Sequence, residues 1–346
     1  MLLHLTDLSS EPLRRQISHQ LLAKILAGAL QEGDELMPAR SFARKQRVSL
    51  NSVEHAYRDL ARKGLITCGG DQRVLVNSLS PTQKQRLTLQ GFLSDEQERQ
   101  RLEEELNMAR QIQIGLLPKM LPNNNLIQMA ASCEPARVIG GDFYDYLPLD
   151  DHRFALVIAD ACGKGMPAAM VISPVQAIIK SEASHGSSIQ QTMQNLNQYV
   201  KRFASTKNFA TLFYGIFDHR SGGFEFANAG HLPPLLARKN GEVELLQPTG
   251  PALGLLAEAE HQIDTTKLRA GDCLLFYTDG VTETMNSPRE EYGEQRLQDL
   301  LVRHRERSAQ EIIRSIIEDL DAFRDSVLLQ DDRTTMVLKV AEENYE

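Results

Sequence analysis

The strongest constraint on this chain is a set of four acidic clusters between residues 140 and 334. Two of them follow apolar runs: the run that begins at Phe154 ends at Asp160, and the run that begins at Cys273 leads to Asp279. A short apolar run is typical of a buried strand, and the residue that follows it lies at the rim of a sheet. The candidate acids of the clusters GGDFYD, DACGKG, TDG and DDRT are Asp142, Asp160, Asp279 and Asp331.

Acids at several strand ends predict a shared metal site. If the strands bring these rims together, the carboxylates repel one another severely unless divalent cations lie between them. Ligand sets made only of oxygen suit Mg²⁺ or Mn²⁺. A single Asp-Gly dipeptide is typical of a surface turn, so the prediction depends on the whole ordered set.

The order of the motifs resembles a known family. GGDFYD is followed by DACGKGMPAA, by NAGHLPP, by TDGVTE and by DDRT. From about Met108 to Val340 the chain is similar to bacterial PPM-type protein phosphatases of the SpoIIE/RsbU branch. The resemblance implies a phosphatase domain over residues 118–346, built as a layered α/β/β/α sandwich. It also implies a serine/threonine phosphoprotein phosphatase that depends on Mn²⁺ or Mg²⁺.

The resemblance further implies roles for single residues. Two divalent ions would share a water and neutralise charge on the phosphoryl group. Asp160 would bridge the ions, Asp142 and Asp331 would hold one of them, and Asp279 would complete the other. The backbone carbonyl of Ala161 is the implied ligand that is not a carboxylate.

Other acids near the motifs have alternative interpretations. Asp145 is a metal ligand, an outer residue or the cap of a turn. Asp332 lies one residue past the position that matches the family's metal ligand. We therefore expect it to lie outside the ligand set and to orient the ligands. Asp272 follows Gly271 and fits a turn that leads into a strand.

Some positions depart from the eukaryotic members of the superfamily. Ala161 and Cys162 stand where those enzymes have Gly-His, so the histidine proposed there as general acid is missing, and another group must protonate the leaving group. Cys162 fits a small buried residue better than a nucleophile. His231 is either an acid or part of a strand-end turn. Arg137 is either a phosphate-binding residue or a solvated surface arginine.

The segment Gly163-Lys164-Gly165 is a poor candidate for a phosphate loop. It lacks the GxxxxGK[ST] order, because no Ser or Thr follows the lysine at the required place. Its glycines instead fit a sharp turn before a helix that begins at Met166 and Pro167.

Length and composition restrict the remaining possibilities. A chain of 346 residues suggests two domains and a connector. The apolar runs are much shorter than the ~18 residues of a membrane span, and no signal-like segment opens the chain. The four cysteines lack metal-type spacing and fit reduced thiols. We therefore expect a cytoplasmic protein.

Residues 1–80 differ in charge from the rest. They contain 11 Lys and Arg against 8 Asp and Glu, net +3, whereas the remainder contains 27 against 38, net −11. Apolar spacing and turn residues predict helices from Pro12 to Gly28, from Pro38 to about Gln46 and from Ser49 to Gly64, followed by a hairpin. This pattern resembles the winged helix-turn-helix of GntR regulators.

That resemblance implies DNA binding, although the reading surface departs from the family. Glu54 lies on the face where the family usually has arginine, and it would repel phosphate. The tentative DNA contacts are Arg40, Arg44, Asn51, Arg58 and Arg73. The alternative is a fold kept for dimerisation or for contact with another protein.

Residues 81–117 are predicted to connect the two domains. A charged helix is expected to begin at Ser94 or Asp95. A narrow apolar stripe on this helix consists of Leu102, Leu106, Ala109 and Ile112. The stripe predicts a parallel homodimer, and the alternative is a helix packed on its own catalytic domain.

These observations predict an α+β protein in which a winged-helix module controls a phosphatase domain. By family analogy its substrate is a phosphoserine or phosphothreonine on a STAS-type anti-anti-sigma factor, in partner-switching control of transcription. The alternative is a GntR-like DNA-binding transcription regulator that uses the phosphatase-like domain for sensing or dimerisation.

Overall fold

The chain divides into two compact units, Met1–Glu103 and Glu104–Glu346. The division falls inside one helix, α4 (Pro81–Leu116). The computed structural model describes residues 3, 5, 12–69, 73–203 and 209–342, and within α4 the side chains of residues 89–98 lie outside that description.

The described part of the first unit has three helices before α4 and an antiparallel sheet of order β1-β3-β2. These elements are α1 (Leu13–Leu26), β1 (Glu35–Leu36), α2 (Ala39–Gln46), α3 (Leu50–Arg62), β2 (Ile66–Cys68) and β3 (Val74–Val76). Ile17 and Leu21 of α1 share a buried core with Val53 of α3. Ser49 caps α3, because its side chain accepts a hydrogen bond from the backbone N of Ser52. The predicted hairpin turn at residues 70–72 lies outside the described residues.

Helix α4 corrects the expected start of the connector helix, which is Pro81 and not Ser94 or Asp95. Ser80 Oγ accepts a hydrogen bond from the backbone N of Gln83 at 3.2 Å, and Gln83 Oε1 accepts one from the backbone N of Ser80 at 2.9 Å. This is a capping box with proline at the first helical position. The interpretation missed it because the first turns of the helix are polar.

The second unit contains two five-stranded antiparallel sheets. One sheet, of order β11-β8-β7-β6-β5, consists of β5 (Asp142–Pro148), β6 (Arg153–Ala161), β7 (Ala210–Asp218), β8 (Gly223–Ala229) and β11 (Asp264–Lys267). The other, of order β10-β9-β12-β13-β4, consists of β4 (Ile127–Glu134), β9 (Leu235–Ala237), β10 (Val243–Leu245), β12 (Cys273–Tyr277) and β13 (Arg333–Val340).

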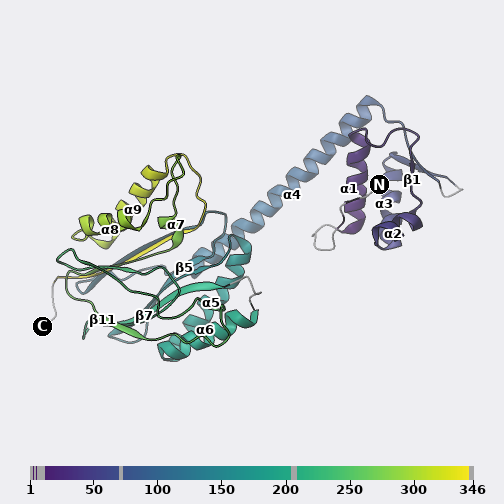
Figure 1. The fold of residues 1–346 in the computed structure, drawn as a ribbon. Coiled ribbons are helices and arrows are strands. Elements are labelled where there is room, and N and C mark those ends of the chain that lie inside the picture. Colours follow the sequence, from purple (N-terminus) through teal and green to yellow (C-terminus); the bar gives the residue numbers. More distant parts are fainter. Residues whose placement is uncertain (1–2, 4, 6–11, 70–72, 204–208, 343–346) are drawn as a thin grey trace. The chain divides into compact units, whose positions relative to one another are not determined.

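The two sheets pack face to face and are covered by helices on their outer faces (Figure 1). Stacked and edge-on rings of Phe213, Phe226 and Phe276 fill the space between the sheets. The covering helices are α5 (Met166–Ser184) and α6 (Ile189–Phe203) on the sheet of β6, and α8 (Glu294–His304) and α9 (Ala309–Arg324) on the sheet of β12. The predicted α/β/β/α layering of the phosphatase-like part is therefore confirmed.

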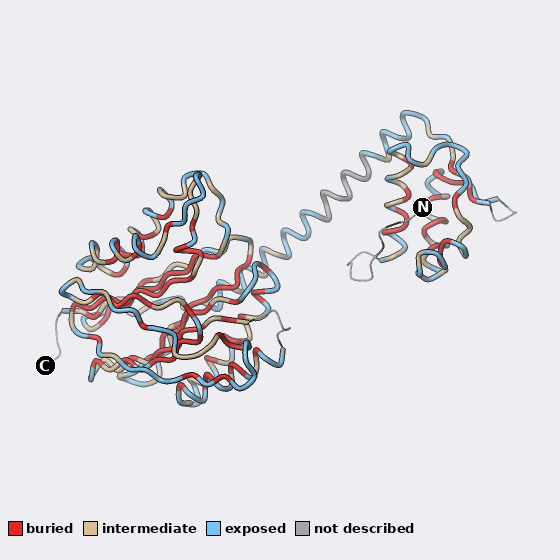
Figure 2. The backbone as a smooth tube through the Cα atoms, in the orientation of Figure 1, coloured by how far each residue is buried: buried red, intermediate tan, exposed pale blue. Residues whose placement is uncertain are grey.

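Burial on both faces explains the apolar runs in the sequence. Strands in the middle of the four layers contact side chains above and below, so both of their faces are apolar. Six consecutive residues of β6, Phe154–Ala159, are buried, and Figure 2 shows such buried segments in both sheets. In the part of the chain that the structure describes, no helix combines the length and the apolarity needed to cross a membrane.

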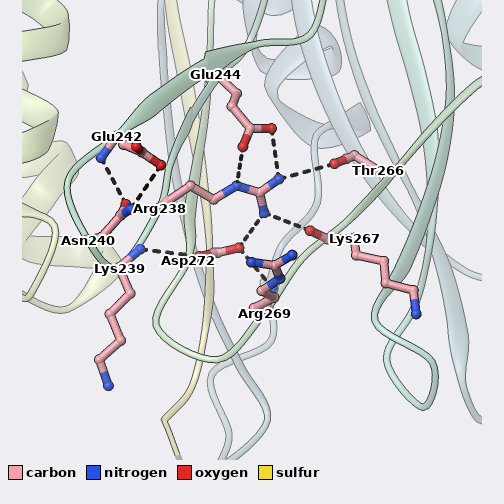
Figure 3. Close-up of polar contacts among 9 residues, drawn as sticks. All are labelled: Arg238, Lys239, Asn240, Glu242, Glu244, Thr266, Lys267, Arg269 and Asp272. Atoms are coloured by element: carbon pink, nitrogen blue, oxygen red, sulfur yellow. Dashed lines mark hydrogen bonds and ion pairs between the residues drawn. The ribbon is translucent and has the colours of Figure 1, made fainter.

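A largely buried arginine ties several strand ends together (Figure 3). The Arg238 guanidinium follows β9 and pairs with Glu244 of β10 at 2.7 and 2.8 Å and with Asp272 at 2.6 Å. It also donates to the backbone carbonyl of Lys267 in β11 at 2.7 Å, so it links strands of both sheets. The turn expected at Asp272 is present, since its backbone N donates to Arg269 O at 2.9 Å. The burial of its carboxylate in an ion pair was not predicted.

Candidate active site

Each sheet brings two of the predicted acids to the site. Asp142 begins β5 and lies directly opposite Asp160 of β6 in the strand register. Asp279 directly follows Thr278 at the end of β12 and begins the short helix α7 (Asp279–Thr282). Asp331 lies just before β13, and β13 is the hydrogen-bonded neighbour of β12.

The acids act on one another electrostatically. Burial, followed by the charges of Asp279 and Asp331, raises the pKa of Asp160 to about 7. Burial and then the charge of Asp331 raise the pKa of Asp279 to about 6. Burial and the charge of Asp160 raise the pKa of Asp142 well above its usual value. Asp160 therefore interacts with each of the other three acids, and Asp279 also interacts with Asp331.

A threonine between the two sheets holds one of these acids. The Thr278 hydroxyl donates to Asp142 Oδ2 at 2.7 Å and accepts a hydrogen bond from the backbone N of Thr334 at 3.0 Å. Thr278 is fully buried, so the bond fixes the orientation of the Asp142 carboxylate across the sandwich.

Asp332 uses both carboxylate oxygens to hold a backbone loop. Its Oδ1 accepts from the backbone N of Ala136 at 2.7 Å, and its Oδ2 accepts from the backbone N of Gly141 at 2.6 Å. A side chain on Gly140 would put its Cβ 2.5 Å from Asp332 Oδ2, and one on Gly280 would collide with the backbone carbonyl of Asp332. Glycine is thus required at position 140 by the carboxylate of Asp332 and at position 280 by the backbone of Asp332.

Asp145 lies apart from the four acids. Its buried carboxylate accepts from Gln176 Nε2 at 3.0 Å and pairs with Lys180 Nζ at 3.1 Å, and both partners belong to α5. The same two side chains donate to the backbone carbonyl of Leu116, the last residue of α4, at 3.0 and 2.8 Å. Asp145 therefore joins α5 and the end of α4. Its partners in the structure do not match the expected roles of metal ligand and turn cap.

Two further expectations are corrected or resolved. Cys162 is exposed, not buried, because β6 ends at Ala161 and the chain turns outward at Gly163, whose φ is +106°. His231 is buried, and burial lowers its pKa to about 4. Its Nδ1 lies 2.9 Å from Thr211 Oγ1. A neutral, enclosed imidazole fits the structural interpretation and not that of a general acid near pH 7.

The tentative phosphate-binding residue Arg137 lies beside the loop that follows β6. A Cβ built on Gly165 would be 3.3 Å from Arg137 Cδ, so the arginine stem passes across this glycine. Arg137 is exposed and directly follows Ala136, the residue that Asp332 holds.

Two site residues were missed by sequence reasoning. Lys164 Nζ lies 2.7 Å from Asp331 Oδ2 and donates to Gln330 O at 2.6 Å; its only sequence signal is its place between two glycines after Asp160. Gln113 of α4 donates to Gly140 O at 2.7 Å and accepts from Gly140 N at 3.1 Å. The end of α4 thus packs on its own catalytic domain, which was the alternative interpretation of that helix.

The tentative DNA contacts lie on the surface of the first unit. Arg40 and Arg44 belong to α2, Asn51 and Arg58 belong to α3, and Arg73 precedes β3. All five are exposed. An open cavity of about 550 Å³ is lined by Arg40, Arg58 and Arg73 and also by Glu54.

The donor chemistry of the second unit fits divalent cations. Its four acids supply only oxygen, and their charges raise one another's pKa, an effect that bound cations reverse. Gly141, whose added Cβ would lie 3.0 Å from the carbonyl oxygen of Ala161, leaves room beside that carbonyl. Among the described residues, no three Asp, Glu, His or Cys side chains already converge as a closed metal cage. Thr278 and Lys164 each engage one of the carboxylates.

Comparison with known proteins identifies the family and the fold of the second unit. The family model "Stage II sporulation protein E (SpoIIE)" matches residues 150–341. The SiaA-PP2C domain of Pseudomonas aeruginosa has the same fold, with a TM-score of 0.63 and 20% identity over 70% of this chain and 98% of that domain. The family match and the fold therefore define a PPM-type serine/threonine phosphatase domain.

The chain belongs to the SpoIIE family. It is 30% identical to the phosphoserine phosphatase RsbU of Bacillus subtilis over 69% of this chain and 71% of RsbU. It is 33% identical to protein IcfG of Synechocystis sp. over 68% of this chain, but the match spans only 41% of IcfG.

Proposed function

We propose that the protein hydrolyses phosphoserine or phosphothreonine on a partner protein and depends on Mn²⁺ or Mg²⁺. The observation that supports the proposal is at Asp160, which lies opposite Asp142 in the strand register and whose pKa is raised to about 7 by burial and by the charges of Asp279 and Asp331. Such repulsion between buried carboxylates favours the binding of divalent cations.

In this proposal Asp160 would contribute to the binding of two divalent cations. Asp142 and Asp331 would help to hold one of them, Asp279 would help to hold the other, and the carbonyl of Ala161 would complete the ligand set. When bound, the cations lower the pKa of a coordinated water and neutralise charge on the phosphoryl oxygens. An all-oxygen ligand set of this kind is what Mg²⁺ and Mn²⁺ prefer.

The chain itself positions the acids and the phosphate. Thr278 orients the Asp142 carboxylate, and Asp332 fixes the loop that carries Ala136 and Gly141. Arg137 lies within that loop, its stem passes across Gly165 in the loop that follows β6, and we assign its exposed guanidinium to binding phosphoryl oxygens of the substrate. A planar guanidinium suits this task because it donates two parallel hydrogen bonds to phosphate.

The proposed substrate is a phosphoserine on a STAS-type anti-anti-sigma factor. It is supported by membership in a family that includes the phosphoserine phosphatase RsbU. The test is to incubate the full chain with a serine-phosphorylated STAS-domain protein and to follow loss of phosphate by mass spectrometry. We expect loss with Mn²⁺, none with EDTA, and a reduction of roughly 10²-fold or more in Asp279→Asn.

The outcomes separate the reaction from the substrate. Hydrolysis of a generic aryl phosphate without hydrolysis of the STAS phosphoserine would reject the substrate and keep the phosphatase. If wild type leaves both intact in excess Mn²⁺, the enzyme proposal is wrong.

For the first unit we propose a winged-helix module that controls the phosphatase, with DNA as a second candidate partner. The DNA candidate is favoured by one observation, the convergence of Arg40, Arg58 and Arg73 on one open cavity. Glu54 on the same cavity opposes it. If DNA binds, the affinity of the full chain for a duplex falls steeply with salt, and Arg58→Ala reduces the slope of log K against log [salt] by about 1. Fluorescence anisotropy at several salt concentrations measures both, and salt-independent binding would reject this candidate.

We also propose that α4 forms the predicted homodimer. Its apolar side chains Leu102 and Ile112 are 50% and 69% exposed, whereas the end of the helix is fixed to its own domain through Gln113 and Leu116. A second copy of α4 would remove this apolar stripe from water.

A further inference from the structure

Lys164 belongs to a motif that the proposed reaction leaves unused. It lies between Gly163 and Gly165, both with positive φ (106° and 70°), in the loop between β6 and α5. This backbone directs the ammonium across the site, where Nζ lies 2.7 Å from Asp331 Oδ2 and 2.6 Å from Gln330 O. The side chain is 41% exposed and that of Asp331 is 25% exposed.

The Lys164 ammonium is a positive charge that pairs directly with one of the four acids. Within the described residues, no other Lys or Arg forms an ion pair with any of the four acids. The charge of Lys164 also reaches Asp279: burial is the largest influence and raises the pKa of Asp279, whereas Lys164 acts in the opposite direction. Lys164 thus offsets part of the repulsion between Asp279 and Asp331. In the proposed site these two acids would bind different cations.

We propose that Lys164 is a tethered cation that competes with a divalent cation for Asp331 and so weakens metal binding. This inference rests on the proposed function, because it takes Asp331 to be a metal ligand. Two cations on one carboxylate repel each other, and the repulsion is strong at a partly buried site. An occupied site therefore requires the ammonium to share Asp331 or to leave it.

The structure provides a place for the displaced ammonium. Lys164 and Asp331 line a small polar pocket whose wall also includes Glu283. A flexible four-carbon stem lets a lysine head group change partners, and Glu283 would receive the charge. The protein would then take up metal only where divalent cation is plentiful, since binding must displace an internal counter-ion.

The decisive measurement is Mn²⁺ affinity by isothermal titration calorimetry on the full chain. We expect Lys164→Met to bind Mn²⁺ about tenfold more tightly than wild type at low salt, and the difference to shrink at high salt because screening weakens partly exposed charges. Lys164→Arg keeps the positive charge and should remain closer to wild type than Lys164→Met.

Lys180→Met is the matched control. Lys180 is 40% exposed, pairs with Asp145 at 3.1 Å and donates to a backbone carbonyl, so it makes the same kinds of contact outside the acid group. The two variants have the same net charge, and we expect Lys180→Met to leave Mn²⁺ affinity unchanged. A second readout is thermal melting, in which Lys164→Met should melt below wild type in EDTA and approach it at saturating Mn²⁺.

Asp331→Asn separates the role of Lys164 as a competitor from the role of Asp331 as a metal ligand. If Asp331→Asn weakens Mn²⁺ binding but Lys164→Met binds no more tightly than wild type, competition by Lys164 is wrong and the metal site stands. If Asp331→Asn leaves Mn²⁺ binding intact, the proposed role of Asp331 fails, and the inference about Lys164 fails with it.

Discussion

Asp160→Asn is expected to lower the rate of phosphoserine hydrolysis by roughly 10³-fold or more. Asp160 lies opposite Asp142 in the register and senses the charges of Asp279 and Asp331, so one substitution weakens the proposed binding of both cations. Loss of an outer partner of a metal ligand already costs about 10- to 100-fold, and loss of a bridging ligand should cost more. Initial rates with saturating Mn²⁺ measure the effect.

The same substitution should stabilise the protein when metal is absent. The folded state holds the Asp160 proton more tightly than the unfolded chain, because its pKa is raised to about 7 from an ordinary value of about 3.9. Its contribution to stability is therefore fully present below about pH 4 and is lost as pH rises to about 7. At pH 8 in EDTA we expect Asp160→Asn to be more stable than wild type by about 2 kcal/mol.

A matched carboxylate in the next strand provides the control. Asp145 is also buried, but it pairs with Lys180 and lies apart from the acid group. Asp145→Asn should therefore lower stability at pH 8 in EDTA, opposite in sign to Asp160→Asn. Denaturant titration of both variants tests the contrast. Full activity in Asp160→Asn, or lower stability at pH 8, would contradict the proposed site.

The largest effect on stability is expected at the arginine of Figure 3. Asp272→Ala should lower the free energy of unfolding of the second unit by about 3 kcal/mol. The substitution removes the more buried of the two carboxylates that pair with the largely buried Arg238 guanidinium. The Arg238 side chain is 12% exposed and that of Asp272 is 3% exposed, whereas that of Glu244 is 49% exposed.

Glu244→Ala removes the exposed partner of the same arginine and is the appropriate comparison. We expect it to cost less than about 1 kcal/mol, as exposed ion pairs usually do. Chemical denaturation at constant Mn²⁺ measures both variants. Equal losses in the two would show that burial does not decide the contribution of this ion pair.

Local physical rules made much of the fold predictable. The apolar run before Asp160 indicated a strand buried on both faces, and β6 is such a strand. A helix was predicted to begin at Ser49, and Ser49 is the residue that caps α3. The cap at Ser80 follows the same rule and was missed only because the helix after it begins without an apolar stripe.

The hydrogen-bond and ion-pair partners of the site residues could not be predicted, because they are brought together by the packing of the two sheets. Asp332 bonds Gly141 across 191 positions of sequence, and Lys164 bonds Gln330 across 166. Cys162 was expected to be buried because small apolar thiols usually are, but the end of β6 places it outside the core. Asp272 has a turn as its local role, and only the packing of β9 and β11 around it supplies Arg238.

The sequence by itself determined which residues lie at strand ends and that Gly163 and Gly165 form a sharp turn, because these depend on periodicity and on the conformation of a few neighbouring residues. Tertiary structure alone decided which acid faces which, that Thr278 orients Asp142, and that a lysine rests on Asp331. Those contacts form only after two sheets from distant parts of the chain have packed together, and no rule based on neighbouring residues contains that information.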